Sequence, residues 1–317
     1  MSQRNYYVVL NTRSGTANDL GLTPEALRQH FSEAGHEVTV DADTDEPLPD
    51  RIERAKASGA DVIVAAGGDG TATAIASAIV GTDTILGILP LGTINLLARD
   101  LGVPLDINQW MAALDGMEPR RIDVGEANGR IFLHKVVIGF IPGVAAGREK
   151  IRGRGELAAK IGLVRYFFRR LLRARRMAVE IQYRNGEAKV ERVLAIAVAN
   201  NDYAEGPGRF FSRDRLDGGS LSLYVLKHLT IRDFFRLTLG MLLGHWRQDD
   251  ALEIENVGSV TIRTRKSLQK VMLDGEVESF DVPVNFKIRP GALWVLAPAV
   301  AEGITAEATM PEAVVGA

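Results

Sequence analysis

Short apolar runs alternate with amphipathic stretches through the first third of the chain. Residues 6–10, 37–40, 61–66 and 84–89 have the pattern of buried strands, and polar or glycine-rich residues follow each of them. Strand–loop–helix units repeated in this way predict a parallel sheet flanked by helices. In such sheets ligands bind at the carboxyl ends of the strands, so those loops are the first place to look for a site.

Beyond about residue 120 the pattern changes to runs of β character. The runs cover residues 131–138, 178–183, 190–198, 221–226, 259–264 and 284–288. Turn sequences such as Asn185-Gly186 separate several of them, which predicts an antiparallel, sandwich-like second domain. Two helical stretches, residues 157–176 and 231–246, interrupt the runs, and Thr230 opens the second with the spacing of a capping box.

A chain of 317 residues exceeds what one hydrophobic core usually organises, so two domains are expected. We predict an α/β nucleotide-binding domain over residues 1–122 and a β-rich substrate domain over residues 123–298. Residues 299–317 form a tail that is expected to pack back on the first domain.

Composition and charge exclude several classes of function. The formal net charge of −2 argues against a surface that binds nucleic acid as a whole, so any basic function must come from a local cluster. The absence of cysteine excludes disulfides, thiolate catalysis and zinc–thiolate sites, and it fits a reducing compartment. We find no secretory signal and no uncharged apolar stretch long enough to span a bilayer. A cytoplasmic protein is therefore expected.

A glycine turn, Gly-Gly-Asp-Gly-Thr at residues 67–71, follows the third predicted strand and opens a helix. Glycines there let backbone N–H groups approach phosphate oxygens, and a helix N-terminus favours negative charge. Asp69 would repel a phosphate unless a cation such as Mg²⁺ bridged the two. No Gly-Lys-Ser/Thr follows, as a P-loop requires, and Thr73 stands where a dinucleotide motif has its third Gly. The alternative is a strand-to-helix turn that needs positive φ.

A second turn, Pro-Leu-Gly-Thr-Ile-Asn at residues 90–95, follows the next predicted strand. Thr93 and Asn95 offer a hydroxyl and an amide to phosphate, ribose or base. On their own these two residues indicate helix capping. Beside the first turn, at the adjacent strand end, they become candidate nucleotide contacts.

These segments together resemble those of the bacterial diacylglycerol kinase-like lipid kinases, which are related to the catalytic domains of sphingosine, ceramide and eukaryotic diacylglycerol kinases. The resemblance covers nearly the whole chain and rests on residues 11–15, 67–71, 92–95, 121–125, 216–219 and 274–276. It implies a Rossmann-like parallel sheet of the NAD kinase and phosphofructokinase type, followed by an antiparallel β-sandwich-like domain. The activity that it implies is ATP- and Mg²⁺-dependent phosphorylation of a hydroxyl on a diacylglycerol-like lipid.

Carried over position by position, the resemblance implies three groups of functional residues. The nucleotide-binding group consists of Asn11, Ser14, Gly67, Gly68, Gly70, Thr71, Gly92, Thr93 and Asn95. The metal group consists of Asp69, Asp123 and Asp274, which form a carboxylate cluster around Mg²⁺ mostly through water, and of Asp217, which helps to bind a structural cation. Glu276 is implied as the general base, with Asp69 and Asp274 as further catalytic residues.

The chemistry of phosphoryl transfer agrees with this assignment. Transfer needs a metal and backbone donors for positioning and charge neutralisation, plus one carboxylate that accepts the alcohol proton. Asp274 and Glu276 flank Gly275, so in an extended segment both side chains face the same way. This predicts a metal-organising acid beside a base, and the alternative for Asp-Gly-Glu is a surface turn.

The chain departs from the family pattern at several positions. Thr12 and Ile94 stand where Pro and Gly are common, and Thr73 and Ala74 stand where many members have Asn-Glu. The last change removes a polar pair from the helix after the first glycine turn. It leaves the metal and base candidates in place.

A basic amphipathic stretch lies between Arg148 and Arg176. It is rich in Lys and Arg, and apolar residues recur at three- and four-residue spacing from Leu157 to Leu172. Such a pattern is typical of a helix that docks on an anionic membrane surface. The alternative is a helix packed on its own domain with a solvated charged face. The apolar run at residues 234–246 predicts core packing, with a lipid-tail groove as its alternative.

Two other functions fit part of the sequence. An NAD kinase-like soluble nucleotide kinase would share the first glycine turn but explains neither the basic stretch nor the late Asp-Gly-Glu. A non-catalytic membrane-binding regulator is suggested by Thr73 and Ala74.

Ceramide, a sphingoid base and a phosphatidylglycerol-like headgroup stay open as acceptors beside diacylglycerol. We also expect a homodimer that associates peripherally with the inner face of the membrane. Nucleic acid is not an expected partner. His134 is expected to be a structural residue rather than a base.

Overall fold

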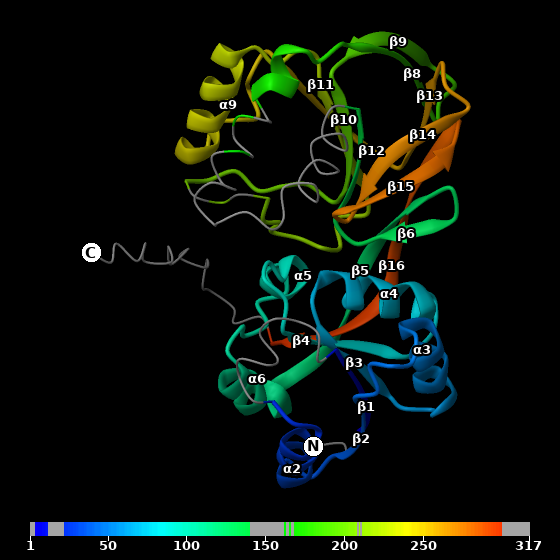
Figure 1. Cartoon of the computed structure of the whole chain (residues 1–317), viewed down its shortest axis with the longest axis vertical. Helices are drawn as coiled ribbons and strands as arrows, with labels where there is room; N and C mark the ends of the chain where they lie inside the picture. Colours follow the sequence, from blue (N-terminus) through cyan, green and yellow to red (C-terminus); the bar gives the residue numbers. More distant parts are fainter. Residues whose placement is uncertain are drawn as a thin grey trace.

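In the computed structural model the chain forms two lobes stacked one above the other (Figure 1). Two sheets organise it: one of ten strands, which runs through both lobes, and one of six strands in the upper lobe. The structure describes residues 4–11, 22–139, 162, 165, 168–207, 209 and 211–299.

The lower lobe is built on four parallel strands in the order β2-β1-β3-β4. The strands are β1 (Asn5–Leu10), β2 (Glu37–Asp41), β3 (Val62–Gly67) and β4 (Ile85–Pro90). The helices of this lobe are α2 (Pro24–Glu33), α3 (Leu48–Ala57), α4 (Asp69–Ile79), α5 (Leu96–Asp100) and α6 (Ile107–Ala113), and a 3₁₀ turn, η1, spans Leu114–Gly116. Every residue of β3 is buried, as expected for a parallel strand covered on both faces. The predicted α/β domain is confirmed.

The upper lobe is a sandwich of antiparallel strands, as the sequence predicted. One sheet has the order β12-β11-β10-β7-β14-β15, and the other contains β13, β8 and β9 beside the first half of β16. The strands are β5 (Met117–Ala127), β6 (Arg130–Phe132), β7 (Lys135–Gly139), β8 (Met177–Tyr183), β9 (Ala188–Val193), β10 (Ala195–Asn200), β11 (Leu221–Leu226), β12 (Leu252–Val257), β13 (Ser259–Thr264), β14 (Leu268–Leu273), β15 (Glu276–Asp281) and β16 (Val284–Pro298). Inward-facing residues of both sheets, such as Ile138, Ile181 and Phe286, make one buried core.

Strands β5 and β16 join the two lobes. They pair antiparallel along most of their length, with a shift of register between Arg289 and Leu293. Below the shift, β16 lies parallel to β4 in the lower sheet, and above it β16 pairs with β13 in the sandwich. The predicted domain boundary at residue 122 falls inside β5, next to this shift.

Three sequence interpretations need correction. The run 131–138 is two strands, β6 and β7, and the run 190–198 is also two, because the chain crosses from one sheet to the other at Leu194 between β9 and β10. The helix α9 (Ile231–Leu243) has the predicted capping box, but it is not core: Asp233 is its only buried residue. Of the predicted helix 157–176, residues 162, 165 and 168–172 are helical, and residues 157–161, 163–164 and 166–167 lie outside the described residues, as does nearly all of the tail. Within the described part of the chain, no helix has the length and apolar character needed to cross a membrane.

Candidate active site

The two glycine turns touch each other at the carboxyl ends of β3 and β4. A Cβ atom built on Gly92 would lie 2.6 Å from Gly68 Cα, so the two backbones pack closer than any side chain allows. The amide of Leu91 also donates to the Gly67 carbonyl (2.9 Å) across the same strand ends. Glycine is therefore required at Gly92 by packing rather than by an unusual φ angle.

Asn95 holds the second turn in shape. Its Oδ1 accepts from the Gly92 amide (3.0 Å) and its Nδ2 donates to the Gly92 carbonyl (2.7 Å). Asn95 is buried and has a left-handed backbone, with φ of 51°. Because both ends of its amide are used within the turn, its side chain organises the site from behind, while exposed Thr93 lines the pocket.

The first turn leads into α4 with its amides available. The first residues of an α-helix have no intrahelical acceptor for their N–H groups, so the amides of Asp69 and Gly70 can face a ligand, whereas the Thr71 amide donates to the Gly68 carbonyl (3.0 Å). Gly67 is fixed by the side chain of Thr71, since a Cβ on Gly67 would lie 2.6 Å from Thr71 Oγ1. Asn11, at the end of β1, donates its backbone N–H to Ala66 and completes this edge of the sheet.

Asp274 and Gly275 form the turn of the β14–β15 hairpin. Their φ angles are 45° and 101°, and Leu273 pairs with Glu276 across the turn. Two central residues with positive φ are the preferred geometry of a two-residue hairpin, for which Asp-Gly is a favoured sequence. The expectation of an extended segment with both carboxylates on one face was therefore wrong. The turn directs the Asp274 carboxylate to backbone amides of its own lobe and the Glu276 carboxylate toward Gly70.

Asp274 binds the backbone of its own lobe. Its carboxylate accepts from the amides of Leu133 (2.7 Å), His134 (3.0 Å) and Lys135 (2.9 Å), which fill the break between β6 and β7. Burial raises the pKa of Asp274, and these three amide hydrogen bonds oppose that rise. Three of roughly four acceptor positions on the carboxylate are thus used, so Asp274 anchors the turn that carries Glu276.

Glu276 points toward the first glycine turn. A Cβ built on Gly70 would lie 3.5 Å from Glu276 Oε1, although the two residues belong to different lobes. A pocket of about 820 Å³ lies between them. Its lining includes Asn11, Gly68, Gly70, Thr71, Thr73, Ala74, Gly92, Thr93, Asp274 and Glu276. Most of the predicted nucleotide residues and the predicted base thus meet in one cavity, while Ser14 lies outside the described residues.

The predicted metal ligands do not come together. Asp123 is buried, and its two oxygens accept from the amides of Gly291 (2.8 Å) and Gly219 (2.6 Å). Asp217 is exposed and pairs with Arg215 (3.0 Å). Across the described residues no three His, Cys, Asp or Glu side chains lie close enough to hold a metal ion, so the expected carboxylate cluster is not assembled. The roles proposed for these residues in metal binding stay predictions.

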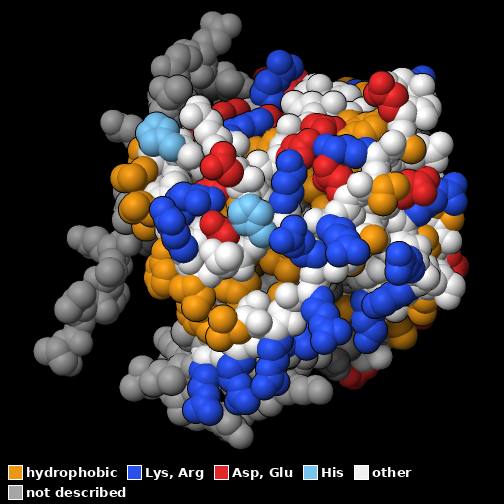
Figure 2. Space-filling model, turned by 90° about the horizontal axis from the view of Figure 1, so that it is seen from above, with side chains coloured by type: hydrophobic (Ala, Val, Ile, Leu, Met, Phe, Trp, Pro, Cys, Tyr) orange, Lys and Arg blue, Asp and Glu red, His pale blue; other side chains and the backbone are white. Residues whose placement is uncertain are grey.

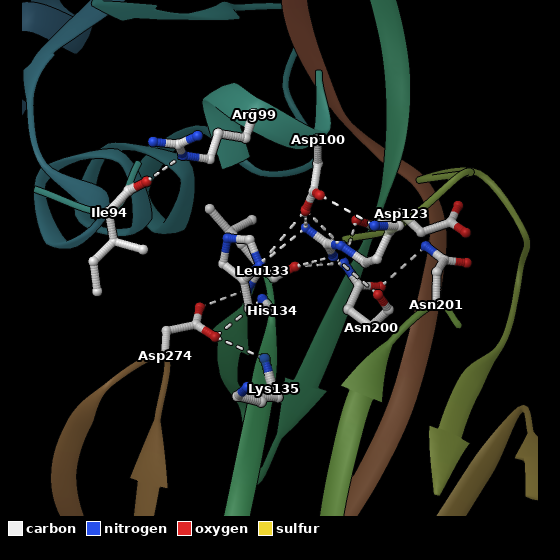
Figure 3. A network of polar contacts seen from close by, with 11 residues as sticks. Ile94, Arg99, Asp100, Asp123, Leu133, His134, Lys135, Asn200, Asn201 and Asp274 are labelled. Carbon is white, nitrogen blue, oxygen red and sulfur yellow. Dashed lines mark hydrogen bonds and ion pairs between the residues drawn. The ribbon is translucent and has the colours of Figure 1, made fainter. Parts of the chain in front are cut away.

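Sequence reasoning missed a buried polar network between the lobes (Figure 3). Arg213, with a fully buried side chain, binds Asp100 at the end of α5 through Nε (2.9 Å) and Nη2 (2.7 Å). Its Nη1 donates to the carbonyls of Leu133 (2.6 Å) and Asn200 (2.9 Å). The network therefore ties the helix after the second glycine turn to the segment that anchors Asp274. No spacing rule could have revealed Arg213, because its partners lie 13 to 113 residues away.

Burial sets the protonation of the histidine and the lysine in this network. Burial, together with Arg213, holds the pKa of His134 well below its ordinary value, so the ring is neutral. Its Nδ1 accepts from Arg213 Nη2 (3.1 Å), which leaves the proton on Nε2. Burial also lowers the pKa of Lys135 to about 8, and its Nζ lies 4.0 Å from the ring centroid of Phe211. The structural role expected for His134 agrees with these contacts.

Family models match both lobes. Residues 5–127 match the diacylglycerol kinase catalytic domain, and residues 151–297 match the YegS C-terminal NAD kinase beta sandwich-like domain. A solved structure described as a putative diacylglycerol kinase from Bacillus anthracis has a TM-score of 0.70 and 22% sequence identity, and the match covers 94% of this chain and 98% of that one. The solved structure supports the two-lobe fold over the 94% of the chain that the match covers.

Relatives named as lipid kinases align over most of the chain. A probable lipid kinase YegS-like protein of Pseudomonas aeruginosa is 34% identical over 275 residues, which cover 84% of this chain and 87% of the relative. A diacylglycerol kinase of Bacillus subtilis is 27% identical over 261 residues, covering 78% and 82%. The chain therefore belongs to the bacterial diacylglycerol kinase-like family of lipid kinases.

Proposed function

We propose that the protein transfers the γ-phosphate of ATP to a hydroxyl group of a diacylglycerol-like lipid at the inner face of the membrane. One observation carries this proposal beyond family membership: the carboxylate of Glu276 lies against Gly70 in a pocket lined by both glycine turns. Phosphoryl transfer needs such an arrangement, because one group accepts the proton of the alcohol while others hold the phosphates.

In this proposal the phosphates of ATP lie at the N-terminus of α4. The amides of its first turn and the helix dipole favour an anion there. Asn11 and Thr93 would add polar contacts from the neighbouring strand ends. Thr73, Ala74 and Ser77 line the same pocket along α4, so this helix would contact the nucleotide through small side chains.

Glu276 is the proposed general base. It is exposed and has no hydrogen-bond or ion-pair partner within the described part of the chain, so both of its oxygens are available as acceptors. As the lipid oxygen forms its bond to the γ-phosphorus, the hydroxyl proton passes to Glu276. The bond from the γ-phosphorus to the bridging oxygen breaks, and ADP leaves.

A magnesium ion held through Asp69 fits this proposal: Asp69 does not itself line the pocket, but it lies between Gly68 and Gly70, which do. Among the predicted metal ligands, Asp69 is the one whose carboxylate has no hydrogen-bond or ion-pair partner in the described residues, and it is half-buried in the first turn of α4. Mg²⁺ is commonly bound by one or two carboxylates together with phosphate oxygens and water. When bound, the ion would neutralise charge on the phosphates.

The direct test uses the purified protein, ATP labelled at the γ-position and a total lipid extract. We expect one labelled lipid phosphate, and identifying it would select among diacylglycerol, ceramide, a sphingoid base and a phosphatidylglycerol-like acceptor. Labelling of NAD with no labelled lipid would instead support the soluble nucleotide kinase. No labelled product of either kind, with vesicle binding intact, would support the non-catalytic regulator.

Gly92→Ala is expected to lower ATP affinity by about 10-fold or more, because the new methyl group must push Gly68 and Asn95 away and separate the two turns. Isothermal titration with ATP measures the effect. Gly116→Ala is the matched control, since a Cβ there meets no atom within 4 Å. Equal ATP affinity in the two variants would contradict the proposed phosphate site.

A further inference from the structure

Helix α9 carries an exposed apolar face. Ile231, Phe235, Leu239, Leu242 and Leu243 are all at least 43% exposed. Their spacing of four, four, three and one residues puts them on one side of the helix. Large apolar side chains grouped in this way on a protein surface mark a site that binds a protein, a membrane or another ligand.

The helix is firmly attached through its opposite side. Asp233 is buried and completes the capping box with Thr230, and it also contacts His228 (2.9 Å). Gly240 packs closely on Trp246, where an added Cβ would lie 3.3 Å from Trp246 Cα. The exposed side chains of α9 therefore belong to a well-anchored helix. Phe168 contacts this face at Phe235, and the face otherwise stays largely exposed among the described residues.

A basic pocket lies next to this face. Phe168 contacts Phe234 and Phe235 of α9, with ring centroids 5.4 and 6.5 Å apart, and Arg169 and Arg173 follow Phe168 in the chain. The pocket has a volume of about 1010 Å³, and no acidic side chain is among the described residues that line it. Seven exposed cations line it: Arg165, Arg169, Arg170, Arg173, Arg175, Arg265 and Lys266.

Most of these cations have no competing acidic partner among the described residues. Apart from Arg170, none of the seven forms an ion pair with another described residue. Figure 2, which looks down on the upper end of the molecule, shows Lys and Arg side chains gathered in a band beside an apolar area. The basic pocket and the pocket lined by Glu276 lie at opposite ends of β7. Gly139, the last residue of β7, lines the basic pocket, and the amide of Lys135, its first residue, donates to Asp274 in the other pocket.

We propose that the exposed face of α9 and the basic pocket together form a docking surface for a bilayer that contains anionic phospholipids. The apolar side chains enter the boundary between headgroups and acyl chains, and the cations bind lipid phosphates. Charge complementarity identifies this partner, since an apolar face bordered by mostly unpaired cations matches an anionic headgroup layer. Each cation near such a surface contributes about fivefold in affinity at moderate salt.

This inference deepens the proposed function, on which it rests for its purpose, because a lipid kinase must meet a substrate that stays in the membrane. It assigns insertion to α9, which the sequence pattern had placed in the core. The cations of the basic pocket alone would give membrane binding that added salt weakens. Insertion of the apolar side chains of α9 gives binding that persists when salt is added.

The test is sedimentation of the full chain with vesicles of phosphatidylcholine and phosphatidylglycerol in equal amounts. The triple variant Phe235→Ser/Leu239→Ser/Leu242→Ser is expected to lose on the order of 100-fold in vesicle affinity, because three apolar side chains no longer leave water. The double variant Arg169→Glu/Arg173→Glu is expected to lose binding to these vesicles. It should no longer prefer vesicles with phosphatidylglycerol over vesicles of pure phosphatidylcholine. Leu105→Ser, an exposed apolar position in the lower lobe, is the matched control and should bind as the wild type does.

Two further readouts separate this inference from the proposed function. Phosphorylation of a short-chain, water-soluble diacylglycerol should be unchanged in the triple variant, and unchanged thermal unfolding would show that it is folded. Wild-type vesicle affinity in the triple variant would overturn the assignment of α9. A stable dimer without vesicles, dissociated by the triple variant, would also overturn it in favour of a second copy of the chain. Vesicle binding without any lipid phosphorylation would reject the kinase proposal and leave the docking surface standing.

Discussion

Glu276→Gln is expected to lower kcat by about 10²- to 10⁴-fold, the usual contribution of a positioned general base. The substitution keeps the shape of the side chain and removes its ability to take the proton of the lipid hydroxyl. Because Glu276 is exposed and has no ion-pair partner in the described residues, the free energy of unfolding should stay within about 0.5 kcal/mol of the wild type. Turnover of labelled ATP with lipid measures the first effect, and urea unfolding measures the second.

Asp281→Asn is the control for this variant. Asp281 is an exposed acid at the far end of the same strand, β15, outside the pocket lining. Its turnover should match the wild type within a few-fold, and ATP affinity should be nearly the same in both variants. A kcat for Glu276→Gln close to that of Asp281→Asn would remove Glu276 from the mechanism.

Arg213→Met is expected to be the most destabilising single change, with a loss of about 3–5 kcal/mol in the free energy of unfolding. The substitution leaves the carboxylate of Asp100 buried without its cation. It also leaves the carbonyls of Leu133 and Asn200 without the donor that Arg213 supplied. Urea unfolding of the variant against the wild type measures the loss.

A double-mutant cycle tests the origin of that loss. Asp100→Leu/Arg213→Met removes both charges, so its destabilisation should be well below the sum of the two single changes. Arg215→Met is the control, because Arg215 also pairs with a carboxylate, that of Asp217 (3.0 Å), but both side chains are exposed and water screens the pair. Additive single effects would show that burial of an unpaired charge is not the cause.

The lower lobe was predictable because its signals are local. Each buried strand is a short apolar run, and the turns after β3 and β4 contain glycines that the packing of Gly68 against Gly92 requires. The same local logic identified the capping box of α9 through Thr230. The meeting of these turns with Glu276 followed from the family resemblance, since more than 200 residues separate the glycine turn from the hairpin.

What the sequence did not predict depends on contacts between distant segments. The direction of Asp274 is set by amides in the gap between β6 and β7, and no local pattern encodes that partner. The crossing between sheets at Leu194 lies inside a continuous apolar run. Helix α9 was misassigned because an apolar run looks the same whether its partner is a protein core or something outside the chain.

The joint between the lobes is a strand pair rather than a loose linker. Both β5 and β16 cross from the parallel sheet into the sandwich, and their register shift lies where Asp123 accepts the amide of Gly291. Any change in the angle between the lobes must therefore bend or twist this hydrogen-bonded pair of strands, and the register shift is the point where the pairing is least regular. The paired strands thus hold the lobes near one angle and keep Glu276 close to the first glycine turn.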